Sequence, residues 1–119
     1  MRNVLTVFFL LTATHAVAET LDAKAIKSEL IGPSITWWSE RGDMKGEMIL
    51  SPGGEAHITI NAPHQASDDG HWSLDGNQLC TIWSTMRRGI TKCYTLRETT
   101  PGHFLTSGGN EFALQGIAV

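Results

Sequence analysis

The chain has 119 residues, with 9 basic and 12 acidic side chains and a formal charge of -3 at pH 7. That length holds one compact domain and excludes a second domain of similar size. The acidic balance excludes a protein that binds nucleic acid through general attraction to phosphates.

The first 18 residues are typical of a secretory leader. Arg2 supplies a positive start, residues 4–11 are almost all apolar, and Ala18 ends a small-residue cleavage signal. The apolar run is too short to span a bilayer and no second run follows it, so we expect no transmembrane segment. We therefore predict a signal peptide over 1–18 and a single exported domain, periplasmic or secreted, over 19–119. Cleavage near Ala18 leaves 101 residues with a charge of -4, because Arg2 is removed.

The chain has two cysteines, Cys80 and Cys93. Export places them where thiols are normally oxidised, so a disulfide is the expected state and two buried free thiols are the alternative. Their spacing fits neither a zinc knuckle nor a C-x-x-C redox motif. A disulfide that closes a loop of this length stabilises a small domain by roughly 3 kcal/mol, which favours a structural role.

One helix is predicted, over Asp22 to Ile31. Asp22 can accept hydrogen bonds from the first turn, apolar side chains recur at spacings of three and four, and Gly32 ends the run. The pattern describes a short amphipathic helix that lies across one end of a sheet.

After Pro33 the apolar pattern changes to a period of two, and glycine-rich turns recur about every ten residues. Short strands at that spacing are typical of antiparallel sandwiches and barrels. The expected strands are 34–40, 45–51, 55–61, 70–75, 78–84, 90–97, 103–107 and 111–116, and the segment 62–69 is the longest and most polar connection. The predicted fold is therefore mainly β: a small antiparallel barrel or sandwich of about eight strands, a lipocalin-like meander, with one N-terminal helix.

The first hairpin allows an internal check. If the turn at residues 52–54 sets Leu50 opposite Ala56, then Met48 meets Ile58, and most of the apolar side chains share one face. The other face is mostly polar, as an antiparallel sheet with one wet side requires.

The second hairpin takes its register from the expected disulfide. With Cys80 opposite Cys93, Ile82 meets Thr91 and the ladder continues to Gly89 near the tip. The reverse face of this hairpin is then its more apolar side.

Lys92 is the first candidate binding residue. It lies with Thr81 on that reverse face, among Trp83, Tyr94 and Leu96. A lysine there either snorkels to the rim of the sheet or faces a polar pocket. The second interpretation describes a barrel lumen in which one cation holds an anionic ligand head.

His57, His64 and His71 follow one another at equal steps of seven, with Asp68 and Asp69 between the last two. Imidazoles with a nearby carboxylate can hold Zn²⁺ or Cu²⁺. A step of seven has no geometric meaning across a strand, a loop and a second strand, so surface histidines are the simpler interpretation. Metal binding stays an alternative, and the sequence indicates no other cofactor.

Two further features are candidate contacts. Trp37 and Trp38 point to opposite faces of one strand, so an outward ring, assigned here to Trp38, either lies under the helix or stacks on a ligand. Arg87 and Arg88, at the tip of the disulfide hairpin, either contact an anion or a partner or prevent pairing at a strand edge.

No catalytic motif is present. The sequence contains no G-x-S-x-G elbow, no phosphate-binding glycine loop and no H-E-x-x-H helix. We therefore assign no catalytic residue, and keep a small hydrolase, or an inhibitor of one, as an alternative function.

The stretch from Gly70 to Trp83 and the segment from Lys92 to Leu96 carry a G-x-W, L-C-x-x-W and C-Y pattern. The layout resembles groups of small exported proteobacterial proteins that are classed as domains of unknown function, and the likeness runs from Asp22 to Arg97. The resemblance implies a periplasmic, β-rich protein with the disulfide and with packed positions for Trp72 and Trp83. It carries over no catalytic residue.

These observations predict a periplasmic binding or interaction module. Its partner is expected to be a small amphipathic or anionic molecule, or an envelope protein, contacted through Trp38, Lys92, Arg87 and Arg88. A metal-binding protein that uses the histidines, and a small hydrolase or hydrolase inhibitor, are the alternatives.

Overall fold

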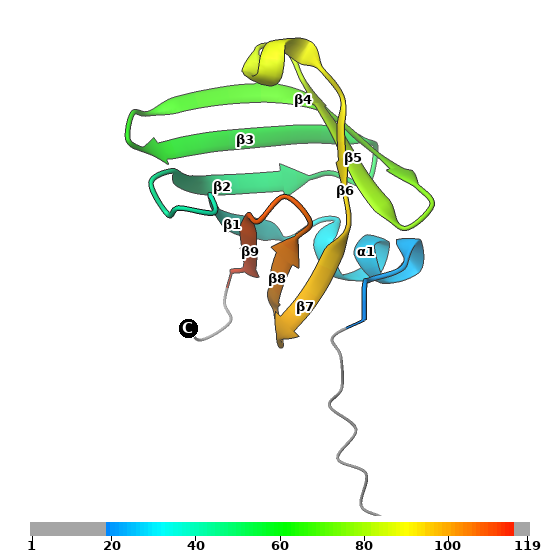
Figure 1. Ribbon diagram of the computed structural model, residues 1–119. Coiled ribbons are helices and arrows are strands. Elements are labelled where there is room, and N and C mark those ends of the chain that lie inside the picture. The colour runs from blue at the N-terminus through cyan, green and yellow to red at the C-terminus, as the bar shows by residue number, and fades with distance from the viewer. Residues whose placement is uncertain (1–18, 116–119) are drawn as a thin grey trace, which may run out of the picture.

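The computed structural model describes residues 19–115, so the predicted leader over 1–18 lies outside the described residues. Within that range the chain forms nine strands and two short helical segments (Figure 1). The helical segments are α1 (Ala23–Leu30) and the 3-10 turn η1 (Met86–Gly89). The strands are β1 (Ser34–Trp38), β2 (Lys45–Leu50), β3 (Glu55–Ala62), β4 (Ala66–Asp75), β5 (Gln78–Trp83), β6 (Lys92–Tyr94), β7 (Leu96–Thr100), β8 (His103–Thr106) and β9 (Glu111–Leu114). Neither helical segment in this part of the chain has the length and apolar character needed to cross a bilayer.

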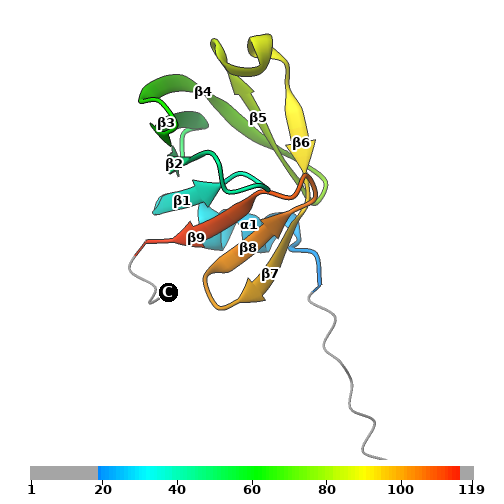
Figure 2. The same cartoon turned by 60° about the vertical axis from the view of Figure 1, so that its left-hand side comes forward.

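All nine strands join one antiparallel sheet in the order β6-β5-β4-β3-β2-β1-β9-β8-β7. The sheet coils into a nearly closed barrel, as Figure 2 shows. Its two edge strands, β6 and β7, are consecutive in the chain and are separated only by Thr95. The Ser107 N–H donates to the Thr95 carbonyl at 3.0 Å and ties this bend to the turn between β8 and β9. The predicted antiparallel, mainly β fold with one N-terminal helix is confirmed.

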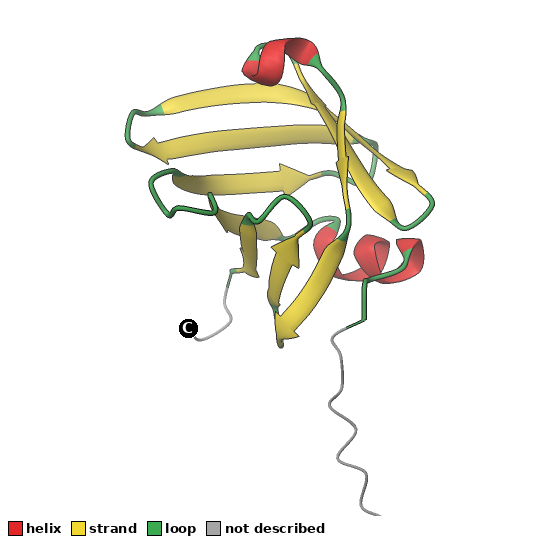
Figure 3. Ribbon diagram, viewed as in Figure 1, coloured by secondary structure: helices red, strands yellow, loops and turns green. Residues whose placement is uncertain are grey.

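Helix α1 closes one end of the barrel. The Asp22 carboxylate accepts a hydrogen bond from the Ala25 N–H at 2.8 Å, and Asn77 in the turn between β4 and β5 accepts another N–H of the first turn at 3.1 Å. Ile26 and Leu30 point from the helix into the core and are fully buried. Each contributes roughly 2 kcal/mol through the apolar surface that it removes from water. Figure 3 shows α1 and η1 at opposite ends of β5.

The β2–β3 hairpin has the predicted register. Leu50 pairs with Ala56 and Met48 pairs with Ile58, and all four side chains are buried in the core. Ile49 lies on the outer face and is 41% exposed. The alternation of apolar and polar residues therefore fixed which face of this hairpin is inside.

The disulfide between Cys80 and Cys93 is confirmed, and the alternative of free thiols is excluded. The two residues are direct partners in the β5–β6 ladder, with their Cα atoms 4.0 Å apart. A bond of this kind persists in an oxidising compartment, as expected for an exported protein. The ladder does not continue toward the tip, because β6 begins at Lys92 and the chain before it folds into η1. The expected pairing of Ile82 with Thr91 is therefore wrong.

Several strand boundaries also differ from the prediction. The segment 90–97 is two strands, since the chain bends at Thr95 and changes its pairing partner from β5 to β8. The expected connection 62–69 is mostly strand, because β4 already begins at Ala66 and pairs with β3. This end of the β3–β4 pair extends past the end of β5, and none of the β4 residues from Ala66 to Asp69 is buried. The expected strand 111–116 ends at Leu114, and its last position lies outside the described residues.

Glu29 on α1 lies beside Glu98 on β7. One carboxylate oxygen of Glu29 is shielded from solvent and has no hydrogen-bond partner among the described residues. Burial, and then the neighbouring Glu98, raise the pKa of Glu29 above its usual value. A group with a raised pKa in the folded state stabilises the fold below its unfolded pKa, and this contribution is lost as the pH rises through the folded pKa.

We expect Glu29→Gln to raise the free energy of unfolding at pH 7, because it removes a partly buried charge that lies beside Glu98. The gain should be about 0.5 kcal/mol, since solvent screens a half-buried carboxylate pair. The wild type should lose this stability as the pH rises above 4.5, the usual pKa of a glutamate, and the variant should not. Urea unfolding across that pH range measures the difference, with the exposed Glu55→Gln on β3 as the control. The same pH dependence in the wild type and in Glu29→Gln would contradict the prediction.

Candidate functional site in the barrel mouth

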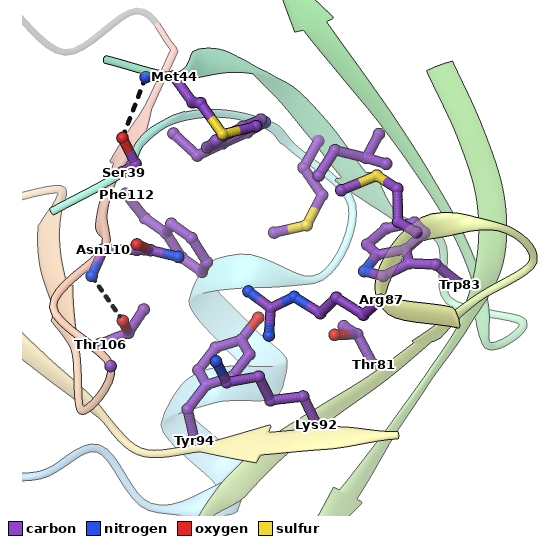
Figure 4. A pocket seen from close by; sticks show the side chains of 15 residues that line it. Ser39, Met44, Thr81, Trp83, Arg87, Lys92, Tyr94, Thr106, Asn110 and Phe112 are labelled. Carbon is purple, nitrogen blue, oxygen red and sulfur yellow. Dashed lines mark hydrogen bonds between the residues drawn. The ribbon is translucent and has the colours of Figure 1, made fainter. Parts of the chain in front are cut away.

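A cavity of about 300 Å³ opens at the end of the barrel away from α1 (Figure 4). Helix α1 lies beside the beginning of β1, whereas the cavity is lined from the end of β5, the beginning of β6 and the turns that follow β1 and β8. The volume is at the lower end of the range found for small-molecule sites. The barrel is therefore filled at one end and hollow at the other.

The floor of the cavity is apolar. It is formed by buried side chains on the inner face of the sheet, namely Trp37, Met48, Ile58, Trp83 and Phe112. Two partly buried methionines, Met44 and Met86, extend this surface toward the opening. Aromatic rings and flexible thioethers together form a surface that fits apolar ligands of varied shape.

Trp37 reaches its place on this floor by crossing a glycine. It is the direct partner of Gly46 on β2, and its indole N–H donates to the Thr59 carbonyl on β3 at 3.2 Å. A Cβ atom at Gly46 would overlap that same carbonyl oxygen. Glycine is thus required at this position by the close approach of β3.

One side of the cavity is cationic. Arg87 from η1 and Lys92 from β6 line it, and in Figure 4 both side chains extend toward Tyr94. Both residues are exposed, as expected for side chains at an opening. None of the fifteen described residues that line the cavity is acidic. The cationic side, Arg87 and Lys92, is therefore free of a competing carboxylate within the cavity wall.

Tyr94 adds a neutral donor beside these cations. Burial raises the pKa of the Tyr94 hydroxyl, while a hydrogen bond with Thr81 and the charge of Arg87 act in the opposite direction. The net shift is upward, so the hydroxyl keeps its proton at physiological pH. Thr81 is 5% exposed and sits on the inner face with Trp83, which explains a polar residue in an apolar strand.

The opposite side carries neutral polar groups. Ser39 donates to Asp43 at 2.7 Å and accepts from the Met44 N–H at 3.0 Å, so its hydroxyl holds the turn between β1 and β2. Thr106 accepts from the Asn110 N–H at 3.0 Å and holds the turn between β8 and β9. The Asn110 side-chain amide faces the cavity in Figure 4. A ligand that spans the cavity would meet cations on one side and an amide on the other.

The residues expected at a binding site are divided by the structure. Lys92 and Arg87 line the cavity, whereas Arg88 and Trp38 are not among its lining residues. Trp38 is half-buried on the outer face at the end of β1, away from α1. The alternative in which Trp38 lies under the helix is therefore wrong. The helix instead packs on the core through its own buried side chains.

The three histidines do not converge. His57 lies on the outer face of β3, where its Nδ1 is 2.6 Å from the Asp69 carboxylate, and both side chains are exposed. His71 pairs with Glu55 on the same outer face, and His64 lies in the connection between β3 and β4. Residues 19–115 contain no group of three or more histidine, cysteine or acidic side chains placed to hold a metal ion.

No pattern in the sequence pointed to Asn110 or Thr106. The run Gly108-Gly109-Asn110 was recognisable as a turn, but a turn signal does not say that its side chains face a cavity. The sequence feature that did point to the cavity was the presence of two polar residues, Thr81 and Lys92, on an apolar strand face.

Comparisons of the chain with protein-family models, with curated proteins and with solved structures found no match.

Proposed function

We propose that the protein is a periplasmic binding module whose barrel holds a small amphipathic acid. The main observation behind the proposal is that Arg87 and Lys92 lie together on one side of a cavity whose floor is apolar. An apolar floor favours a hydrocarbon or aromatic body, and two cations with no carboxylate among the residues that line the cavity favour an anionic group at its end. Asn110 is placed to contact a polar group at the other end of such a ligand.

Two further observations support this proposal. The overall charge is negative, so the cationic side is a local feature of the cavity and not part of a generally basic surface. The secretory pattern of residues 1–18 and the Cys80–Cys93 disulfide agree with a periplasmic location.

The test uses two fluorescent probes that differ by one charge. Anilinonaphthalene sulfonate is an aromatic anion, and phenylnaphthylamine is the same ring system without the sulfonate. We expect the wild type to bind the sulfonate saturably, and Arg87→Met and Lys92→Met each to weaken that binding about tenfold, the cost of one charge-assisted hydrogen bond. Binding of phenylnaphthylamine should change less than about twofold, because methionine keeps the apolar part of each side chain.

The matched controls are Arg41→Met, in the turn between β1 and β2, and Lys24→Met, on the exposed side of α1. Neither residue lines the cavity, so neither change should alter the affinity for either probe. Native mass spectrometry of the purified protein would show whether an acidic ligand is retained. If the wild type bound neither probe and retained no ligand, or if both probes lost affinity equally in the cation variants, the proposal would be wrong.

A further inference from the structure

The turn Ser84–Ile90 folds the chain over the mouth of the cavity and carries Arg87. Three successive residues in it have left-handed backbone conformations: Arg87 with φ 52°, Arg88 with φ 55° and Gly89 with φ 67°. Only the last of these is a glycine, for which the conformation is easy. Non-glycine residues keep such a conformation where the surrounding structure holds them in it.

The group that holds the turn is the Asp68 carboxylate. Its Oδ2 atom accepts the N–H of Thr85 at 2.9 Å and the N–H of Met86 at 2.8 Å, and its Oδ1 atom accepts the N–H of Asp69 at 2.9 Å. The first two bonds satisfy the free N–H groups at the start of η1, which the side chain of Thr85 does not cap. These backbone hydrogen bonds also lower the pKa of Asp68, so the carboxylate is ionised when it accepts them.

Asp68 reaches the turn because β5 ends opposite Gly70, whereas β4 begins four residues before Gly70, at Ala66. The last pair of the β4–β5 ladder is Gly70 with Trp83, and beyond it the chain leaves β5 and folds over the inner face of β4. Asp68 lies on that face, two residues from Gly70 and opposite Ile58, which is on the cavity floor. Asp69 supports the same turn through its carbonyl, which accepts from the Ser84 N–H at 2.9 Å and from the Ser84 hydroxyl at 2.7 Å.

We propose that Asp68 is the positioning residue of the binding site: by fixing the backbone of the turn Ser84–Ile90, it sets the Arg87 guanidinium against the anionic end of the ligand. The inference rests on the proposed function for the ligand, but the positioning itself is a property of the free protein. Asp68 is not among the residues that line the cavity, so it acts through Arg87 and not through the ligand.

The test is a double-mutant cycle with anilinonaphthalene sulfonate as the probe. We expect Asp68→Ala to weaken binding about tenfold in the wild-type background, the loss expected for a misplaced charge-assisted hydrogen bond, and less than about twofold in the Arg87→Met background. Asp68→Asn should keep part of the affinity, because an amide oxygen can accept the same two N–H groups. Asp75→Ala, an exposed aspartate at the far end of the same strand, is the control and should change nothing.

Equal losses in both backgrounds would show a general effect on the fold, and no loss in either would show that the turn holds without Asp68. Either result would overturn the inference. Failure of the wild type to bind the probe would refute the proposed function instead, and the positioning role would then be judged on the free protein. There, nuclear Overhauser contacts between Arg87 and the Tyr94 ring should be present in the wild type and lost in Asp68→Ala. Their persistence in Asp68→Ala would also overturn the inference.

Discussion

Replacement of Gly46 by alanine is expected to lower the free energy of unfolding by about 3 kcal/mol, the upper end of the usual cost of overpacking. The added methyl group would overlap the Thr59 carbonyl on β3, and a carbonyl within a ladder cannot move without breaking its own pairing. The same carbonyl accepts the indole N–H of Trp37, so the substitution also displaces a ring from the cavity floor. The urea midpoint of unfolding and the affinity for phenylnaphthylamine should therefore both fall.

Gly108→Ala is the matched control for the stability measurement, since Gly108 itself lines the cavity and is no control for probe binding. The backbone of Gly108 does not need a left-handed conformation, and a Cβ atom there would have ordinary contacts, the nearest at 3.9 Å. Its effect on stability should stay within about 0.5 kcal/mol. If Gly46→Ala were as stable as this control, β2 and β3 would have room to separate and the crossing of Trp37 over Gly46 would not explain the glycine.

Removal of the disulfide is expected to cost roughly 3 kcal/mol, through the entropy that an open loop restores to the unfolded chain. The two cysteines are 13 positions apart, and the loop between them contains the turn Ser84–Ile90. The variant to use is Cys80→Ala with Cys93→Ala, since Cys80 is 3% exposed and a serine there would bury a hydroxyl group.

Reductant provides the control for the disulfide variant. It should lower the urea midpoint of the wild type to that of the double alanine variant and leave the variant itself unchanged. A double alanine variant as stable as the oxidised wild type would mean that the β5–β6 pairing already restricts the unfolded chain, and would remove the structural explanation of the bond.

The parts of the fold that could be predicted are those in which local pattern and global packing agree. Most apolar side chains of the β2–β3 hairpin, Leu50 and Met48 among them, fall on one face, and this pattern distinguishes the inner from the outer face although Ile49 lies outside. The helix was recognisable from the cap at Asp22 and the stop at Gly32, which act within a few residues of each end. Cys80 and Cys93 fixed a second strand pairing, because a covalent bond allows little freedom in register.

The features that could not be predicted depend on contacts between distant segments. Thr95 looks like any strand residue, and its bend becomes visible only when β8 is in place to pair with β7. The turn Ser84–Ile90 contains two arginines in a conformation that sequence alone disfavours, and it is held by Asp68 from another strand. A periodicity argument counts neighbours along the chain, so it continued the β5–β6 ladder where the structure ends it.

Part of the candidate site could be predicted from the sequence, again where a local pattern was informative. Lys92 was identified because a cation on an apolar strand face must have a polar environment, which is a local inconsistency that needs no structure to notice. Arg87 and Arg88 could not be told apart by sequence, yet of the two only Arg87 lines the cavity.

The bend at Thr95 has a consequence for how the protein behaves among copies of itself. An open sheet has two separate edges, each with unpaired N–H and C=O groups that can template pairing with another chain. Here a single run of chain supplies both edges, and each of its halves is short: β6 has three residues and β7 has five. Little unsatisfied backbone is therefore offered to a neighbour, and we expect the protein to stay free of strand-to-strand association at high concentration while the mouth of its barrel remains open to ligand.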